Sequence, residues 1–229
     1  SDRDFCMYFL HACSMTSIHL GKLSSELILW SSNLAKLFNV HPEYSTGSSI
    51  MPQKRNPDSL ELIRSKANII RTKSQEFSNI ISNLPLTYFK DFQEDKKIIF
   101  ECFDELSLCL DVMSDVIKKS DFNKKIGVQL CEANFATATD LADYLVIEKN
   151  IPFRKSYKTI ADIVQFALKN KMKLSEISLK EFQKFEKSID SNIYQYIDVK
   201  KSLSRKKTNM STNPKEVSKK IHKFQKFLK

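Results

Sequence analysis

Apolar and small residues recur at alternating steps of four and three along three long stretches of the chain. The first stretch runs from Phe9 to Leu37, the second from Leu60 to Leu84, and the third over about residues 91–119. A repeat of this kind places one apolar stripe on a helix that packs lengthwise against other helices. The pattern predicts three long helices that lie side by side in one bundle.

The first two stripes can be written out position by position. The first consists of Phe9, Cys13, Thr16, Leu20, Leu23, Leu27, Trp30, Leu34 and Leu37. The second consists of Leu60, Ile63, Ala67, Ile70, Ser74, Phe77, Ile81 and Leu84 and ends before Pro85. Because helices this long rarely find enough partners within a small domain, we expect their apolar faces to pack against further chain or other subunits.

The pattern changes after Gly127 to shorter helical segments, at residues 138–148, 154–170, 179–185 and 214–227. We therefore expect an all-α fold in two parts. Residues 1–128 would form part of a central bundle of long helices, and residues 129–229 a smaller C-terminal helical domain. The composition agrees, because 3 glycines and 6 prolines are too few for the many turns of a sandwich or barrel.

Five cysteines occur without a CxxC pair, which favours neither a zinc site nor a disulfide framework. We expect them to be reduced and mostly buried in a cytoplasmic protein. No apolar run is long enough to predict a membrane span. The chain has no initiator Met and opens just before a helical pattern, so we expect it to be a piece of a longer protein.

The formal charge of +10 raises the possibility of nucleic-acid binding. Much of the excess lies between Lys200 and Lys229, where eleven lysines and arginines face Glu216 alone. No nucleic-acid-binding motif accompanies this tail, so a solvated lysine-rich surface is the preferred interpretation and nucleic acid is not an expected partner. Such a surface can still steer anionic substrates.

The polar connection between the first two long stretches carries the most specific chemistry. It contains Gly47-Ser48-Ser49, whose small residues can expose backbone N–H groups to an anion. Lys54 adds a positive charge close to the next helix, whose N-terminus also favours anions. Pro57 suits the first turn of that helix, with Asn56 as its cap. These residues predict a cradle for a carboxylate or a phosphate.

The run Gly47-Ser48-Ser49-Ile50-Met51-Pro52-Gln53-Lys54-Arg55-Asn56-Pro57 resembles the signature of the fumarase and aspartase superfamily, whose members add or remove a group across fumarate. Residues 58–67, which read Asp-Ser-Leu-Glu-Leu-Ile-Arg-Ser-Lys-Ala, make it similar to the argininosuccinate lyase family in particular. Residues 86–96 resemble that family's Tyr-x-Lys-Asp-x-Gln-Glu-Asp-Lys stretch. Residues 138–146, 152–154 and 202–205 extend the likeness over essentially the whole chain, as the C-terminal half of the family.

The resemblance implies β-elimination of argininosuccinate to arginine and fumarate, a reaction of arginine biosynthesis and the urea cycle. In the family the first serine of the signature, here Ser48, is the base. Its alkoxide would need support from Lys54 and from loop N–H groups. Lys54 and Asn56 match positions that grip a carboxylate of the fumarate moiety. Glu61 matches a carboxylate that orients the acid histidine.

The remaining candidates concern substrate binding. Tyr88, Gln93 and Lys96 in the later stretch match substrate-binding positions of the family, with Lys90 and Asp95 as neighbouring candidates. Ser49 and Met51 are further candidates within the signature. Asp95 could pair with the arginine-like end of the substrate. The resemblance calls for no metal and no organic cofactor.

None of the four histidines, His11, His19, His41 and His222, matches the family's acid, which follows a threonine in an earlier segment. In the superfamily each active site is assembled from three subunits of a homotetramer, so this chain would supply the base loop but not a complete site. Tyr157 replaces a common histidine, and residues 209–214 lack the usual glycines. A non-catalytic relative similar to delta crystallin is the alternative interpretation.

Overall fold

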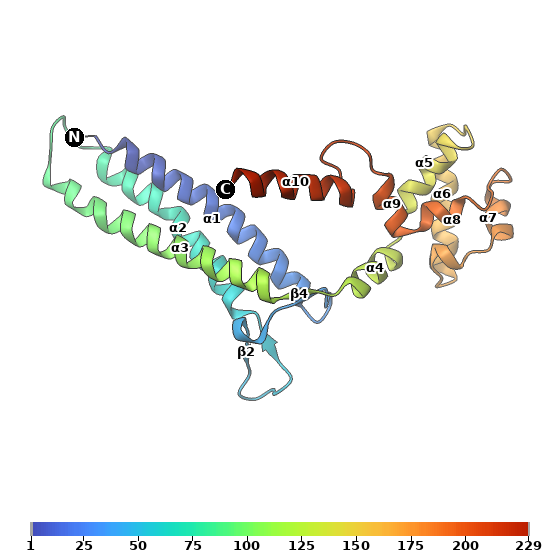
Figure 1. The fold of residues 1–229 in the computed structure, drawn as a ribbon, viewed down its shortest axis with the longest axis horizontal. Helices are drawn as coiled ribbons and strands as arrows, with labels where there is room; N and C mark the ends of the chain where they lie inside the picture. Colours follow the sequence, from blue (N-terminus) through green and yellow to red (C-terminus); the bar gives the residue numbers. More distant parts are fainter. Residues whose placement is uncertain (1, 229) are drawn as a thin grey trace. The chain divides into compact units, whose positions relative to one another are not determined.

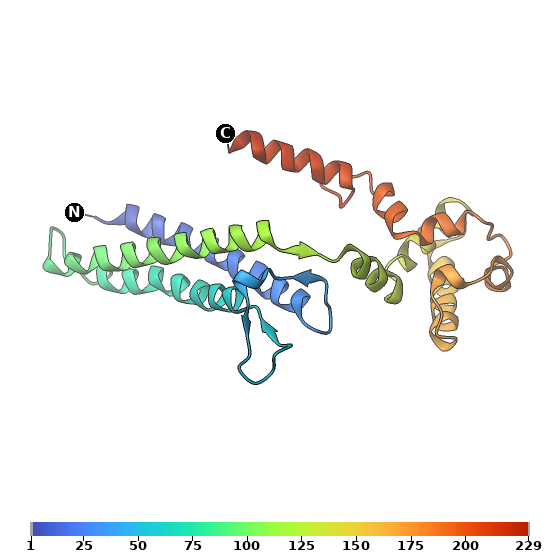
Figure 2. The same ribbon diagram turned by 60° about the horizontal axis from the view of Figure 1, so that its bottom comes forward.

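A computed structural model describes residues 2–228 of the chain, which form two compact units that meet between Lys124 and Lys125. The first unit is built on three long helices: α1 (Asp4–Ser31), α2 (Asp58–Ile81) and α3 (Asp95–Lys119). Figures 1 and 2 show these helices side by side. The all-α prediction is confirmed, because the strands are limited to two-residue pairs.

The links between the long helices contain short elements. They are β1 (Phe38–Asn39), the 3-10 turn η1 (Pro42–Tyr44), β2 (Thr46–Gly47), β3 (Arg55–Asn56), η2 (Lys90–Glu94) and β4 (Asp121–Phe122). β1 pairs with β4, and β2 pairs with β3, both antiparallel. The predicted third helix therefore starts later than expected, because residues 90–94 form the 3-10 turn η2.

The stripe predicted for the second helix is confirmed at Leu60, Ile63, Ala67, Ile70 and Phe77, which are buried. Its members Ser74 and Ile81 are only half-buried, and α2 ends at Ile81 rather than Leu84. In this segment apolar side chains alone fill the face turned to the core. Their alternating spacing therefore identifies that face directly.

The stripe predicted for the first helix is partly wrong. Cys13, Leu20 and Leu27 are buried as expected, but Leu23 and Leu34 are exposed. Leu10, Ser17 and Ser24 are buried instead of the predicted positions one residue before them. The helix also ends at Ser31 rather than Leu37. A turn begins at this point, in the run Ser31-Ser32-Asn33.

Small residues on α1 allow it to lie close to α2. A Cβ placed on Gly21 would meet the Cβ of Ala67 at 3.4 Å. The Ser17 hydroxyl donates a hydrogen bond to the carbonyl of Ser14 at 2.8 Å. Close contact between these helices explains why serines occupy core positions that a hydrophobicity pattern assigns to leucine.

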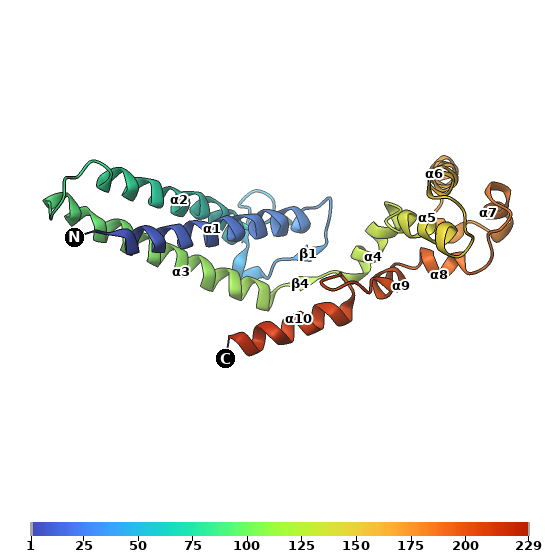
Figure 3. The ribbon, with the colours of Figure 1, turned by 90° about the horizontal axis from the view of Figure 1, so that it is seen from above.

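The second unit consists of shorter helices. They are α4 (Lys124–Ala133), α5 (Ala138–Ile147), α6 (Phe153–Lys169), α7 (Leu179–Phe185), α8 (Ile193–Ile197), α9 (Val199–Arg205) and α10 (Pro214–Phe227), with the 3-10 turn η3 (Leu174–Glu176). Figure 3 shows α6 nearly end-on beside α5. A separate core forms here around Tyr144, whose hydroxyl donates to Asp190 at 3.0 Å. The segments predicted at 138–148, 154–170, 179–185 and 214–227 are helices, whereas α4, α8 and α9 went unpredicted.

Candidate active site

A short antiparallel ladder closes the loop that carries the predicted base. β2 and β3 pair so that Thr46 lies opposite Asn56, which holds together the two ends of residues 48–54. The N–H of Lys54 donates to the carbonyl of Met51 at 3.0 Å and adds a turn within the loop. The signature segment therefore projects as a hairpin from the end of the bundle where α2 begins (Figure 2).

Ser48 sits at the start of this hairpin and is half-buried. Its Oγ accepts hydrogen bonds from the backbone N–H groups of Ile50 and Met51, each at 3.2 Å. Donors that face an oxygen atom favour its ionised form. The loop N–H groups that we expected beside the base are therefore present.

The capping predicted for the cradle is wrong. Asn56 does not cap α2, because it lies in β3 and Pro57 occupies the N-cap position without a side-chain cap bond. Gly47 also has no positive φ, and a Cβ placed on it would have no other atom within 4 Å. Both residues are held by the ladder, so strand geometry sets their backbone angles.

Lys54 is exposed, and its side chain makes no hydrogen bond or ion pair within residues 2–228. Ser49 and Met51 are also exposed on the hairpin. Glu61 lies in the first turn of α2 with its side chain in solvent. These groups surround the start of α2 and leave the positive charge of Lys54 available to an anion.

Tyr44 connects the start of the hairpin to two helices. This role could not be assigned from the sequence pattern. Its carbonyl accepts from the Ser59 hydroxyl at 2.8 Å, and its own hydroxyl donates to Asp115 at 3.3 Å. The Lys119 ammonium lies 5.4 Å from the ring centroid and pairs with Glu43 at 2.6 Å. No local signal reveals these contacts, because Asp115 is 71 positions away along the chain.

The second group of predicted residues lies in the link between α2 and α3 and in the first turn of α3. Tyr88, Lys90, Gln93 and Lys96 are all exposed there. Asp95 differs, because it is buried at 5% exposure.

The Asp95 carboxylate is held within the chain. Its Oδ2 accepts from Arg3 Nε at 2.8 Å, and Lys96 Nζ lies 3.4 Å from Oδ1. Burial alone raises the pKa of Asp95, but the Arg3 hydrogen bond and the charge of Lys96 outweigh burial and leave that pKa below its usual value. Asp95 is therefore a charged carboxylate whose two oxygens already have cationic neighbours.

The two groups of predicted residues lie at opposite ends of the bundle. The hairpin precedes α2, and the Tyr88 to Lys96 segment follows it (Figures 1 and 2). α2 has 24 residues, and at 1.5 Å per residue it separates the two groups by about 36 Å. One chain therefore does not bring Ser48 and Lys96 to the same small molecule.

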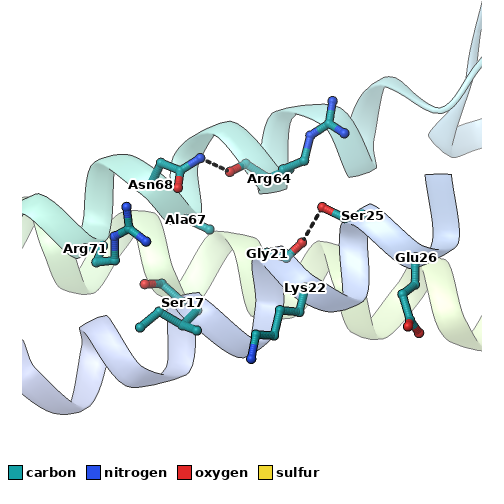
Figure 4. A pocket seen from close by; sticks show the side chains of 10 residues that line it. Ser17, Gly21, Lys22, Ser25, Glu26, Arg64, Ala67, Asn68 and Arg71 are labelled. Carbon is teal, nitrogen blue, oxygen red and sulfur yellow. Dashed lines mark hydrogen bonds between the residues drawn. The ribbon is translucent and has the colours of Figure 1, made fainter. Parts of the chain in front are cut away.

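A groove between α1 and α2 forms an open cavity of about 530 Å³. Figure 4 shows Ser17, Gly21 and Ala67 near its floor, with Arg64 and Arg71 along one side. None of the predicted site residues lines it. Within residues 2–228 no group of three or more His, Cys, Asp or Glu side chains could hold a metal ion, and no helix there has the length and apolar character of a membrane span.

Two family models match the chain. The model described as "Lyase" covers residues 1–71, which include the hairpin, and the model described as "Argininosuccinate lyase C-terminal" covers residues 135–204. An argininosuccinate lyase of Pelagibacter ubique is 38% identical over 226 residues, 99% of this chain. Another, of Syntrophus aciditrophicus, is 37% identical over 98% of this chain.

The chain belongs to the argininosuccinate lyase family. It spans about half the length of the curated relatives it matches, 49% of the Pelagibacter protein and 48% of the Syntrophus protein. The match to these members of the argininosuccinate lyase family runs through both groups of candidate residues.

Solved structures give the same architecture. A variant of EDDS lyase solved with bound fumarate superposes with a TM-score of 0.87 at 22% identity, covering 99% of this chain and 46% of the other. The 3-carboxy-cis,cis-muconate lactonizing enzyme of Pseudomonas putida gives a TM-score of 0.65 at 14% identity, over 85% of this chain and 47% of the other. At these identities the likeness concerns the fold alone.

Proposed function

We propose that the chain provides the base-bearing loop of an argininosuccinate lyase, which cleaves argininosuccinate to arginine and fumarate by β-elimination. The observation that carries the proposal is the Ser48 Oγ, which accepts two backbone N–H groups at 3.2 Å. In the reaction this oxygen takes a proton from the carbon beside a substrate carboxylate. The guanidino nitrogen then leaves the neighbouring carbon, and the new double bond completes fumarate.

Two problems of this reaction correspond to features of the hairpin. A serine hydroxyl is a weak base, so its ionised form needs nearby donors, which Ile50 and Met51 provide. Negative charge also builds up on the substrate carboxylate as the proton leaves, and preorganised donors must stabilise it. We assign that task to the free ammonium of Lys54 and the amide of Asn56, with Ser49 and Met51 as further contacts.

The general acid lies outside the hairpin in this proposal. Glu61 is exposed at the start of α2, where it can orient a histidine supplied by another part of the assembly. His41 is nearest to the hairpin in sequence, but its ring Nδ1 accepts from the N–H of Glu43 at 3.4 Å, which gives it a local role.

We also propose that the enzyme is a homotetramer whose sites combine different copies. The separation of about 36 Å along α2 supports this, because Ser48 and the Tyr88 to Lys96 segment must act on one substrate. If two copies pack antiparallel along their bundles, the hairpin of one meets the α2–α3 connection of the other. Each chain would then contribute its hairpin to one site and its Tyr88 to Lys96 segment to another.

An outward stripe on α3 supports packing against a second copy. Phe100, Phe103, Leu110 and Ile117 follow one another at steps of three or seven residues. Their side chains are 43% to 61% exposed. A second apolar stripe on a helix that already buries one toward its own bundle is typical of helices with partners on two sides.

The experiment that tests the proposed activity is a coupled assay for fumarate release by the protein at its natural length. The Ser48→Ala variant should lose about 10²- to 10⁴-fold in kcat, the contribution of a positioned base. Its KM should change little, since no substrate carboxylate contact is removed. Full activity in the alanine variant would exclude Ser48 as the base.

A non-catalytic relative similar to delta crystallin remains the second candidate. Solved structures titled fumarate lyase:delta crystallin from Brucella melitensis share the fold at 18% and 19% identity. The two candidates separate in the same assay, because a purely structural protein releases no fumarate at any enzyme concentration. A cytoplasmic location is also proposed, on the support of five free cysteines.

A further inference from the structure

The segment between α2 and α3 is tied to the start of α1 by one side chain. Arg3 donates from Nε to Asp95 Oδ2 at 2.8 Å. Its guanidinium carbon also lies 4.9 Å from the ring centroid of Phe92. Both targets are buried, Asp95 at 5% and Phe92 at 6% exposure. Arg3 therefore contacts the two residues of the segment that point into the bundle.

The same two residues set the direction of the exposed side chains around them. Phe92 stacks against Tyr88 with ring centroids 5.9 Å apart and planes inclined by 29°. Gln93 follows Phe92 directly, and Lys96 follows Asp95 directly. When Phe92 and Asp95 are fixed, the exposed Tyr88, Gln93 and Lys96 are fixed with them.

The backbone at the start of the segment needs such an anchor. Thr87 has a φ of 95°, a conformation that costs a β-branched residue free energy and persists only where the surroundings enforce it. The link before it, residues 82–86, contains no helix or strand. The ordered position of Tyr88 therefore depends on contacts made further along, at Phe92 and Asp95.

We infer that Arg3 is a positioning residue for substrate binding: it holds the Tyr88 to Lys96 segment in the geometry that presents Tyr88, Gln93 and Lys96 to the substrate. The inference rests on the proposed function and deepens it. Arg3 contacts the buried side of the segment, so it acts through Phe92 and Asp95 and not on the substrate itself.

Arginine suits this role better than lysine. Its planar guanidinium can donate to a carboxylate from Nε and at the same time lie against an aromatic ring. A lysine ammonium keeps the charge beside Asp95 but offers no plane to Phe92. Arg3→Lys should therefore keep the ion pair with Asp95 but lose the contact with the Phe92 ring. Arg3→Gln should lose the ion pair as well.

The first test measures KM and kcat for argininosuccinate in the protein at its natural length. Arg3→Gln should raise KM roughly tenfold, the effect of losing one charge-assisted contact, with kcat changed by less than about twofold. Arg3→Lys should give a smaller rise in KM. Lys73→Gln is the matched control, because Lys73 bonds to Glu101 at 3.0 Å elsewhere in the same bundle and its loss should leave KM unchanged.

The second test does not depend on activity. Backbone amides of residues 89–96 should exchange hydrogen faster in Arg3→Gln than in the wild type or in Lys73→Gln, while amides in the middle of α2 should stay protected. Unchanged exchange at residues 89–96, or an equal rise of KM in Lys73→Gln, would overturn the inference about Arg3. A wild-type protein that releases no fumarate would instead contradict the proposed function.

Discussion

Arg3 and Asp95 form an ion pair between the N-cap residue of α1 and the first residue of α3, with Nε and Oδ2 2.8 Å apart. The two residues are 92 positions apart in the chain. Because Asp95 is almost completely buried, its negative charge is stable only while cationic partners stay close. This contact links the folding of the bundle to the geometry of the segment proposed to bind substrate.

Acid should remove the stabilisation that this pair provides. The pKa of Asp95 is lowered in the folded state, so its contribution is fully present above the unfolded value of about 3.9 and is lost as pH falls through the folded value. At neutral pH, Asp95→Asn should lower the free energy of unfolding by about 2 kcal/mol. Denaturant unfolding of both proteins at several pH values should show this difference shrinking below about pH 4.

Glu43→Gln provides the control for the acid experiment. The hydrogen bond from Lys119 also lowers the pKa of Glu43, but both side chains are largely in solvent. Solvent screens such a pair, so the variant should match the wild type in stability. A difference between Asp95→Asn and wild type that stays constant down to the lowest pH would contradict the assigned pKa direction.

Four of the five cysteines should be inert to thiol reagents in the native protein. Cys6, Cys13, Cys102 and Cys109 are buried, and Cys131 is partly accessible. Burial, with the neighbouring Cys13 adding to it, raises the pKa of Cys102 to about 12. Since only the thiolate reacts, labelling near neutral pH should modify Cys131 first.

Mass spectrometry of the labelled protein checks this prediction, and the same labelling in denaturant should reach all five thiols. Rapid native labelling of Cys102 would show that the bundle opens far more readily than its packing indicates.

Alkali should lower the free energy of unfolding. Between about pH 9 and pH 12 the unfolded Cys102 thiol loses its proton while the folded one keeps it, so stability falls as pH rises.

Ser24→Ala should stabilise the first unit by about 1 kcal/mol, because alanine is the better helix former and a buried hydroxyl without a partner is removed. Ser24 Oγ is buried and has no hydrogen-bond partner within the described residues. Ser17→Ala is the matched control, since the Ser17 hydroxyl donates to the Ser14 carbonyl. Thermal or denaturant unfolding that ranks Ser17→Ala above Ser24→Ala would contradict this assignment.

These serines also illustrate which parts of the fold could be predicted from the sequence. The face of α2 could be predicted, because its buried residues are all apolar: Leu60, Ile63, Ala67, Ile70 and Phe77. The face of α1 could be predicted only in part, because Ser17 and Ser24 lie in the core where α1 and α2 approach closely. Hydrophobicity cannot mark a position whose requirement is small volume.

The candidate site divides in the same way. The Ser48 hairpin could be located because its residues are contiguous and belong to a specific motif. The roles of Tyr44 and Arg3 could not, since their partners Asp115 and Asp95 are distant in sequence. The two residue groups lie at opposite ends of α2 because of the length of that helix. Only the structure shows that one chain therefore cannot bring both groups to the same small molecule.

The central claim is that Ser48 and the Tyr88 to Lys96 segment act together only when they come from different copies. It is tested most directly by mixing two inactive variants, Ser48→Ala and Lys96→Met, each at the natural length of the protein. After joint refolding or coexpression, a site regains activity when its hairpin comes from the Lys96→Met variant and its second segment from the Ser48→Ala variant. Random assembly of equal amounts gives about a quarter of wild-type activity.

The measurement is fumarate release by the mixed assembly compared with each variant alone. Recovery to about a quarter of the wild-type rate is the predicted result, because each site draws its two halves independently from different copies. A mixture no more active than the separate variants would show that one chain supplies both halves, and would contradict the shared site.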